Sequence, residues 1–234
     1  MRNINTILVR ELRSLFNSAT AYIIMVVFLG LSGWFFASSL FLQNVASLRS
    51  VFETTPFLLL FFAPAITMRT ISEEKKVGTI ELLLTKPVKD QDIVIGKFLA
   101  SWFFFMIALV PTLVYLVSLL MVGKVDAGPI VGGYLGLLLL GGGFLALGII
   151  GSALSENQVV AFIVSFLIMF SFFIVDKIVA FLPVSVATVV EYLGIDYHFS
   201  NIARGVIDSR DLVYYVSLIG FSLFVATSLL ERRK

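Results

Sequence analysis

The sequence predicts an all-α integral membrane protein with six transmembrane helices. Of its 234 residues, 59% are hydrophobic and only 14% are charged, and the mean hydropathy is +1.02. A soluble domain usually contains about 25% charged residues, so this chain has too little polar surface to cover a globule. Uncharged stretches long enough to cross a bilayer recur along the sequence, as a spanning helix needs about 20 apolar residues.

The composition also excludes several classes of function. The chain has no cysteine and one histidine, which rules out disulfides, thiolate catalysis and multi-histidine metal sites, so no metal site is expected. The net charge of +2 comes from 17 basic and 15 acidic residues, and this balance argues against a nucleic-acid partner.

The first span is expected at residues 19–42, which contain no ionisable side chain. The run is far longer than the 7–15-residue core of a secretory signal, so we interpret it as a retained helix. Residues 1–18 precede it, and their polar residues Arg10, Glu11, Arg13 and Ser14 lie mostly between apolar residues at helical spacing: Ile4, Ile7, Leu8, Leu12, Leu15 and Phe16. This pattern predicts an amphipathic helix in the inner membrane interface. The alternative is a basic flank that only sets topology.

The second span, residues 51–70, is the least regular. Only 15 uncharged residues separate Glu53 from Arg69, and they include Pro56 and Pro64. At about 1.5 Å per residue, this segment alone is too short for the hydrocarbon layer. Either residues 45–52 extend the helix, or the helix is broken and packed inside the bundle, where protein or water can satisfy its backbone.

The four remaining spans are clearer, and the segment between the last two is external. Pro111 is expected to kink the third span. Gly132 and Gly136 form a GxxxG motif in the fourth span, which predicts close helix packing. Residues 178–211 are too apolar for a free loop and predict two short helices that are re-entrant or lie in the outer interface. The spans are expected at residues 97–122, 128–154, 157–177 and 212–230.

Orientation follows from the distribution of lysine and arginine. With the N-terminus inside, 12 of the 17 basic residues face the cytoplasm, which satisfies the positive-inside rule. The other five would face outside: Arg49, Lys124, Lys177, Arg204 and Arg210. Both termini are therefore predicted to be cytoplasmic, in a multi-pass protein of the cytoplasmic membrane.

The loop at residues 71–96 contains a second amphipathic element. Gly78 and Pro87 bracket a short helix candidate over residues 79–85, in which Ile80, Leu83 and Leu84 form an apolar face. Asp90 is expected to cap the next helix. A short helix between two spans is suited to docking on a soluble partner. Alternatively, its leucines lie on the membrane surface.

Polar residues in the external segment suggest local contacts. His198 is expected to be a hydrogen-bonding residue rather than a proton relay. Arg204 and Asp208 are four residues apart and could form an ion pair. The sequence contains no P-loop, nucleophile elbow or zinc-protease motif, so this chain is not expected to be an enzyme.

The polar loop also resembles a known family. Residues 73–88, EEKKVGTIELLLTKPV, together with Ile93–Lys97, resemble the signature loop of ABC-2 type transporter permeases. LSENQ at residues 154–158 and RGVIDSRD at residues 204–211 are similar to the gliding-motility-associated permease branch of Bacteroidetes. Many relatives have a small hydroxyl residue at the position of Lys89, which leaves capping to Asp90.

The resemblance implies an N-terminal elbow helix, a cytoplasmic coupling helix between the second and third spans, and external helices between the fifth and sixth. It implies contact with an ABC ATPase subunit, present in two copies and carrying ATP and magnesium, while this chain binds no cofactor. It also implies a second permease chain, with a large external domain, in surrounding lipid. The implied ATPase contacts are Glu73, Glu74, Gly78, Thr79, Ile80, Glu81, Leu83, Leu84 and Pro87; the implied external gate or partner contacts are His198, Arg204, Asp208, Arg210 and Asp211.

Two functions are compatible with this resemblance. The first is a permease subunit that couples ATP hydrolysis by a partner to export across the membrane. The second is a membrane-embedded force transmitter or scaffold that moves an external partner domain without transporting a substrate.

Overall fold

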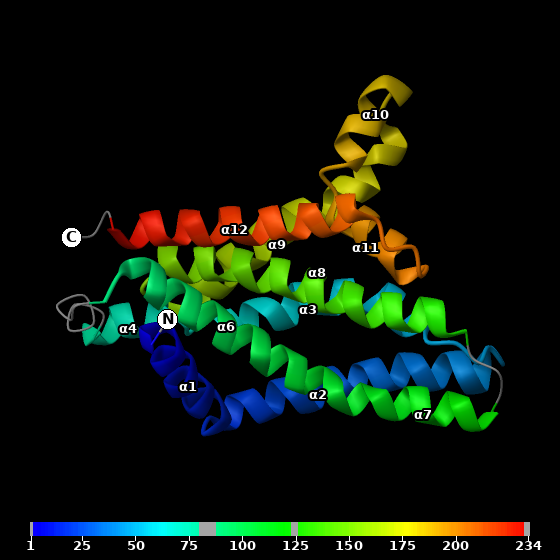
Figure 1. The fold of residues 1–234 in the computed structure, drawn as a ribbon, viewed down its shortest axis with the longest axis horizontal. Coiled ribbons are helices and arrows are strands. Elements are labelled where there is room, and N and C mark those ends of the chain that lie inside the picture. Colours follow the sequence, from blue (N-terminus) through cyan, green and yellow to red (C-terminus); the bar gives the residue numbers. More distant parts are fainter. Residues whose placement is uncertain (1, 80–87, 123–125, 232–234) are drawn as a thin grey trace.

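The computed structural model describes residues 2–79, 88–122 and 126–231. Helices make up the fold, and no strand occurs within those ranges, so the predicted all-α class is confirmed. Six helical segments are long and apolar enough to span a membrane, as predicted. The start of α1 and the end of α12 lie at one end of the bundle (Figure 1). The six candidate spans are Ala19–Leu42, Arg49–Val77, Asp90–Val122, Ala127–Leu154, Gln158–Ile178 and Ser209–Glu231.

Helix α8 (Ala127–Leu154) is the centre of the bundle. Of its most apolar window, 78% is buried, against 17–28% for the first, third, fifth and sixth spans. Its glycines allow this burial because neighbouring groups occupy the places of the missing side chains. A Cβ at Gly132 would overlap the Ile202 carbonyl oxygen, and one at Gly136 would lie 3.1 Å from the Phe199 ring. The GxxxG face therefore packs against α11.

Helix α3 (Arg49–Thr67) runs through both prolines without interruption. Of the two alternatives, the N-terminal extension is observed, since the helix begins at Arg49. The chain bends later, between Met68 and Ile71, and continues as the short helix α4 (Ser72–Val77). The bend therefore lies at the polar end of the span, beyond its apolar window.

Helix α1 (Arg2–Phe16) packs across the start of α6 (Asp90–Leu109). Gly96 makes this approach possible, because a Cβ there would lie 2.8 Å from Cγ2 of Ile7. After Leu109 the third span passes through the 3-10 turn η2 (Val110–Thr112), which contains Pro111, into α7 (Leu113–Val122). The sharp turn coincides with the proline, which lacks a backbone donor.

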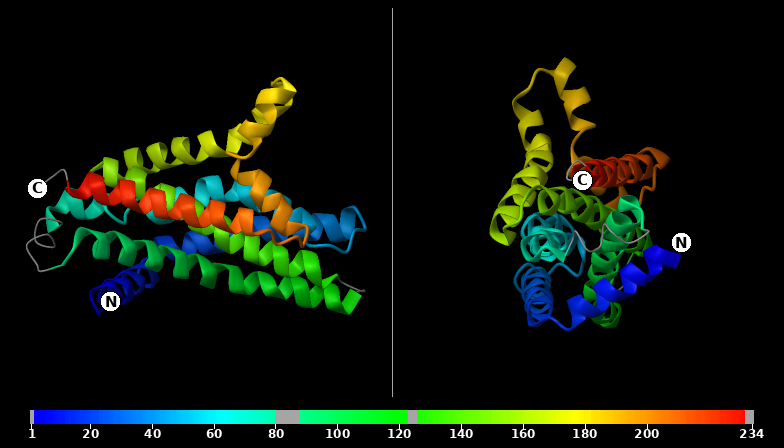
Figure 2. Two further views of the ribbon diagram at one scale, coloured as in Figure 1. Left: turned by 45° about the horizontal axis from the view of Figure 1, so that its top comes forward. Right: turned by 90° about the vertical axis from the view of Figure 1, so that its left-hand side faces the viewer.

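The remaining helices complete the bundle. Helix α2 (Ala19–Ala37) ends in the π-helical turn η1 (Ser38–Leu42). Helix α9 (Gln158–Ile178) continues through η3 (Val179–Phe181) to α10 (Val184–Glu191), which projects away from the bundle (Figure 2). Helices α11 (Ile195–Ala203) and α12 (Ser209–Glu231) then return the chain across the end of α8 and along its length.

Candidate functional site

The bend between α3 and α4 is held by one hydroxyl group from α8. Oγ of Ser152 accepts hydrogen bonds from the backbone N–H groups of Ile71 (3.0 Å) and Ser72 (3.2 Å) and donates to the Met68 carbonyl (3.2 Å). These backbone groups lose helical partners at the bend, and a buried backbone group without a partner is costly. A single side chain of the central helix therefore fixes the angle of α4.

Helix α4 is also attached to the end of α8 by a lysine. Lys75 is buried, and its ammonium donates to the Ala153 carbonyl in the last turn of α8. The C-terminal end of a helix carries partial negative charge and unpaired carbonyls, so a cation is favourable there. Together with Ser152, this contact fixes α4 to α8 at two points.

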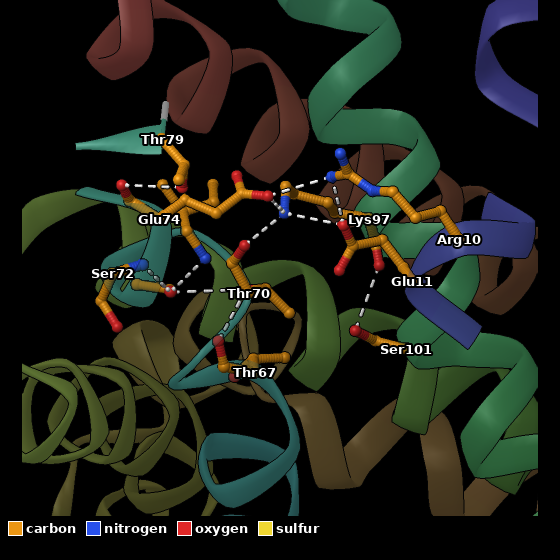
Figure 3. Close-up of polar contacts among 11 residues, drawn as sticks. Arg10, Glu11, Thr67, Thr70, Ser72, Glu74, Thr79, Lys97 and Ser101 are labelled. Atoms are coloured by element: carbon orange, nitrogen blue, oxygen red, sulfur yellow. Dashed lines mark hydrogen bonds and ion pairs between the residues drawn. The ribbon is translucent and has the colours of Figure 1, made fainter. Parts of the chain in front are cut away.

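On its other side, α4 joins a cluster of four charged residues: Arg10 and Glu11 from α1, Glu74 from α4 and Lys97 from α6. We call these residues the charged cluster (Figure 3). The side chain of Lys97 is 1% exposed, and its Nζ contacts Oε1 of Glu74 at 3.0 Å and Oε1 of Glu11 at 3.2 Å. Nζ also donates to the Thr70 carbonyl at 2.5 Å. Three acceptors match the three donors of an ammonium group.

Arg10 completes the charged cluster at its more exposed edge. Its guanidinium donates to Glu11 (2.7 Å) and Glu74 (3.0 Å). Partial burial lowers the pKa of Arg10, but the hydrogen bonds and charges of Glu11 and Glu74 outweigh this effect and leave the pKa above its ordinary value. Two cations and two carboxylates make the cluster neutral, as a partly buried ionic group requires.

The predicted loop residues fall into three groups. Glu74 points inward to Lys97, whereas Glu73 and Thr79 are exposed. Gly78 ends α4 in the left-handed conformation (φ 75°), which favours glycine. Ile80, Glu81, Leu83, Leu84 and Pro87 lie outside the described residues.

The expected capping role of Asp90 is wrong. Asp90 is the first residue of α6, and the residue at the N-cap position is Lys89, whose side chain makes no capping bond.

At the opposite end, His198 and Asp211 form a buried pair between α11 and α12. Nδ1 of His198 lies 2.6 Å from the Asp211 carboxylate, and Nε2 lies 3.1 Å from the Tyr192 carbonyl. The ring stacks on Tyr214 at 4.0 Å. Both ring nitrogens face acceptors, so donating to both requires a doubly protonated ring.

The suggested Arg204–Asp208 ion pair is not formed, as judged from the described residues. Asp208 instead accepts from the backbone N–H of Arg210 (2.9 Å) at the start of α12. Both arginines are exposed.

Arg204 lines a cavity of about 660 Å³ between the ends of α3, α8, α9 and α11. Its walls include the ion pairs Arg49–Glu53 (2.7 Å) and Lys177–Asp196 (2.8 Å). Phe52 and Phe199 add buried aromatic surface. The volume is within the range of small-molecule sites.

The sequence analysis missed how α11 is attached to α9. The Asp176 carboxylate accepts from the backbone N–H of Asp196 (2.8 Å) in the first turn of α11. Gly194 precedes that helix, and a Cβ there would overlap the carboxylate. A glycine immediately before a short helix is the only local signal, since the capping residue is 20 positions away.

These features define a polytopic helical membrane protein with a polar helix junction at one end and a charged cavity at the other. Residues 16–229 match the family model described as ABC-2 family transporter protein. The chain therefore belongs to the ABC-2 transporter family, whose members are membrane components of ABC transporters and partner an ABC ATPase subunit. No curated protein matches the sequence.

Proposed function

We propose that this chain is a permease subunit of an ABC exporter in the cytoplasmic membrane, with both termini in the cytoplasm. One observation carries the proposal beyond the family: α4, the first part of the predicted coupling loop, has direct polar contacts with three helices. Its contacts with α8 and with Lys97 of α6 are largely buried, and the Arg10–Glu74 pair joins it to α1. A force applied to α4 would therefore reach each of these helices through a direct side-chain contact.

In this proposal an ATPase subunit binds beside the end of α4. Val77 is 67% exposed there although it is apolar, and Gly78 and Thr79 are exposed as well. These residues lead directly into residues 79–85, the helix candidate that the sequence predicts to dock on a soluble partner. Two ATPase copies would bind ATP and magnesium, and their closure would move α4 in each permease.

The opposite end would receive this movement through α8. Helix α8 packs against α9, α11 and α12, the helices that carry the external cavity and the His198–Asp211 pair. A rigid central helix is one physical route by which two ends of a bundle are coupled. The proposed cargo path passes the external cavity and ends at a gate formed by the external helices.

A force transmitter remains a second candidate because α10 extends beyond the bundle (Figure 2). The preceding turn presents Phe181, which is 88% exposed. This projection suits contact with a second permease chain that has an external domain. Such a complex could move that domain without passing a substrate.

The ATPase contact can be tested with two matched valines. Val77 and Val206 are 67% and 64% exposed, and they lie at opposite ends of the helix bundle. We expect Val77→Asp to reduce co-purification of a P-loop ATPase from native membranes, whereas Val206→Asp leaves it unchanged. An ATPase that co-purifies equally with both variants would contradict the proposed docking position. Absence of any ATPase from the wild-type preparation would contradict the permease function.

A further inference from the structure

We propose that a phospholipid with a phosphoethanolamine headgroup binds in a cavity beside the charged cluster. The cavity has a volume of about 230 Å³ and lies between α1, α3, α4 and α6. The inference requires a membrane-inserted chain and does not depend on ATP coupling.

The lining offers one positive and one negative group without a partner. Arg69 and Glu73 both line the cavity, and neither side chain forms a hydrogen bond or ion pair within the described ranges of the chain. The other two charged lining residues, Glu11 and Lys97, are paired with each other. A ligand with one phosphate and one ammonium would therefore match the free charges, with the phosphate at Arg69 and the ammonium at Glu73.

Hydroxyl groups also line the cavity and add donors for a phosphate. Ser14 and Ser18 line it at the corner where α1 meets α2. Ser18 occupies the N-cap position of α2, yet its side chain makes no capping hydrogen bond. Its hydroxyl is therefore not used by the helix that it precedes. Hydroxyl and guanidinium donors together are common ligands of phosphate oxygens.

The chemistry of the cavity favours a primary ammonium over choline. Recognition of a quaternary ammonium uses aromatic side chains. None of the described lining residues is aromatic. A primary ammonium instead donates hydrogen bonds, for which the Glu73 carboxylate is the free acceptor. Phosphatidylethanolamine therefore fits better than phosphatidylcholine.

The position of the cavity indicates a lipid rather than a soluble phosphate compound. Arg69 and Glu73 follow the end of α3 at Thr67, and the sequence predicts that the second span ends at residue 70. The lining also contains Leu15, Ile66 and Ala100, which provide apolar contacts for the glycerol end of a lipid. A headgroup at this depth keeps its acyl chains in the bilayer.

The test is native mass spectrometry of the full chain released from vesicles with equal amounts of phosphatidylethanolamine, phosphatidylcholine and phosphatidylglycerol. We expect wild-type protein to retain phosphatidylethanolamine about tenfold over either other lipid, because each charge-assisted hydrogen bond contributes about that factor. Arg69→Gln and Glu73→Gln should each reduce this retention about tenfold. Arg13→Gln, an exposed arginine of α1 outside the lining, is the matched control and should have no effect.

Several outcomes would overturn the proposal. Equal retention of the three lipids by the wild type would exclude headgroup recognition, whatever the variants do. Preferred phosphatidylglycerol would show an anion site in which Glu73 has no role. Displacement by free phosphoethanolamine at millimolar concentration would identify a soluble ligand instead. If a charge variant fails to fold, Ser14→Leu provides a second test, because it narrows the cavity from the exposed face of α1 without changing charge and should also lower retention.

Discussion

Replacement of Lys97 by methionine tests the charged cluster most directly. The change removes an ammonium that is 1% exposed and bonded to three oxygen atoms. It leaves the carboxylates of Glu11 and Glu74, 16% and 19% exposed, with Arg10 as their remaining partner in the cluster. Breaking a buried pair by removing one partner costs about 3–5 kcal/mol. Because Arg10 still neutralises part of the charge of these carboxylates, we expect the free energy of unfolding to fall by an amount near the lower limit, about 3 kcal/mol.

The assay is reversible unfolding of the full chain in mixed detergent micelles, with Lys76→Met as the matched control. Lys76 is the exposed lysine next to Lys75 in α4, and its replacement should change the unfolding free energy by less than about 0.5 kcal/mol. The double variant Lys97→Met with Glu74→Gln should recover part of the loss, because a carboxylate no longer remains without its ammonium. A single variant within about 1 kcal/mol of wild type, or a double variant no better than the single, would refute this reasoning.

Two further predictions concern the other helix junctions. Gly194→Ala should lower the free energy of unfolding by about 1–3 kcal/mol, since the new methyl group overlaps the Asp176 carboxylate. Gly220→Ala, whose methyl group meets no atom within 4 Å, should have no such cost, and thermal unfolding distinguishes the two variants. Ser152→Ala should lower the free energy of unfolding by about 1–3 kcal/mol and speed hydrogen exchange at the two backbone amides of the α3–α4 bend. Unchanged exchange rates at those amides would contradict the role of the hydroxyl.

The fold class could be predicted because hydropathy sums over whole segments. Each span needs only length and a low number of charges, and local errors average out over about 20 residues. Helix α3 was harder, because its two prolines suggested a break, whereas the structure continues through both and bends after Thr67. Packing against the surrounding helices outweighs the tendency of proline to break a helix, because 61% of the most apolar window of this span is buried.

The polar contacts could not be predicted, because they join positions far apart in the chain. Lys97 and Glu11 are separated by 86 residues, and Ile71 and Ser152 by 81. In the sequence, Lys97 was only part of a family motif, and Ser152 was one small residue in a glycine-rich span. Periodicity identifies the face of a helix but contains no information about which distant polar atom will meet it. The contact of Glu74, an implied ATPase contact, with Lys97 could therefore not be predicted.

The two kinds of contact at α4 have different consequences for movement. On the α8 side, the Ser152 hydroxyl and the Lys75 ammonium form hydrogen bonds with buried backbone groups. Separation of α4 from α8 would therefore leave polar backbone atoms without partners in a low-dielectric environment. On the α1 and α6 side, the cluster is neutral and borders a cavity, so water can reach its carboxylates when the helices separate. The second separation is therefore less costly than the first. If an ATPase moves α4, the structure favours movement of α4 together with α8, and relative movement at the junction with α1 and α6.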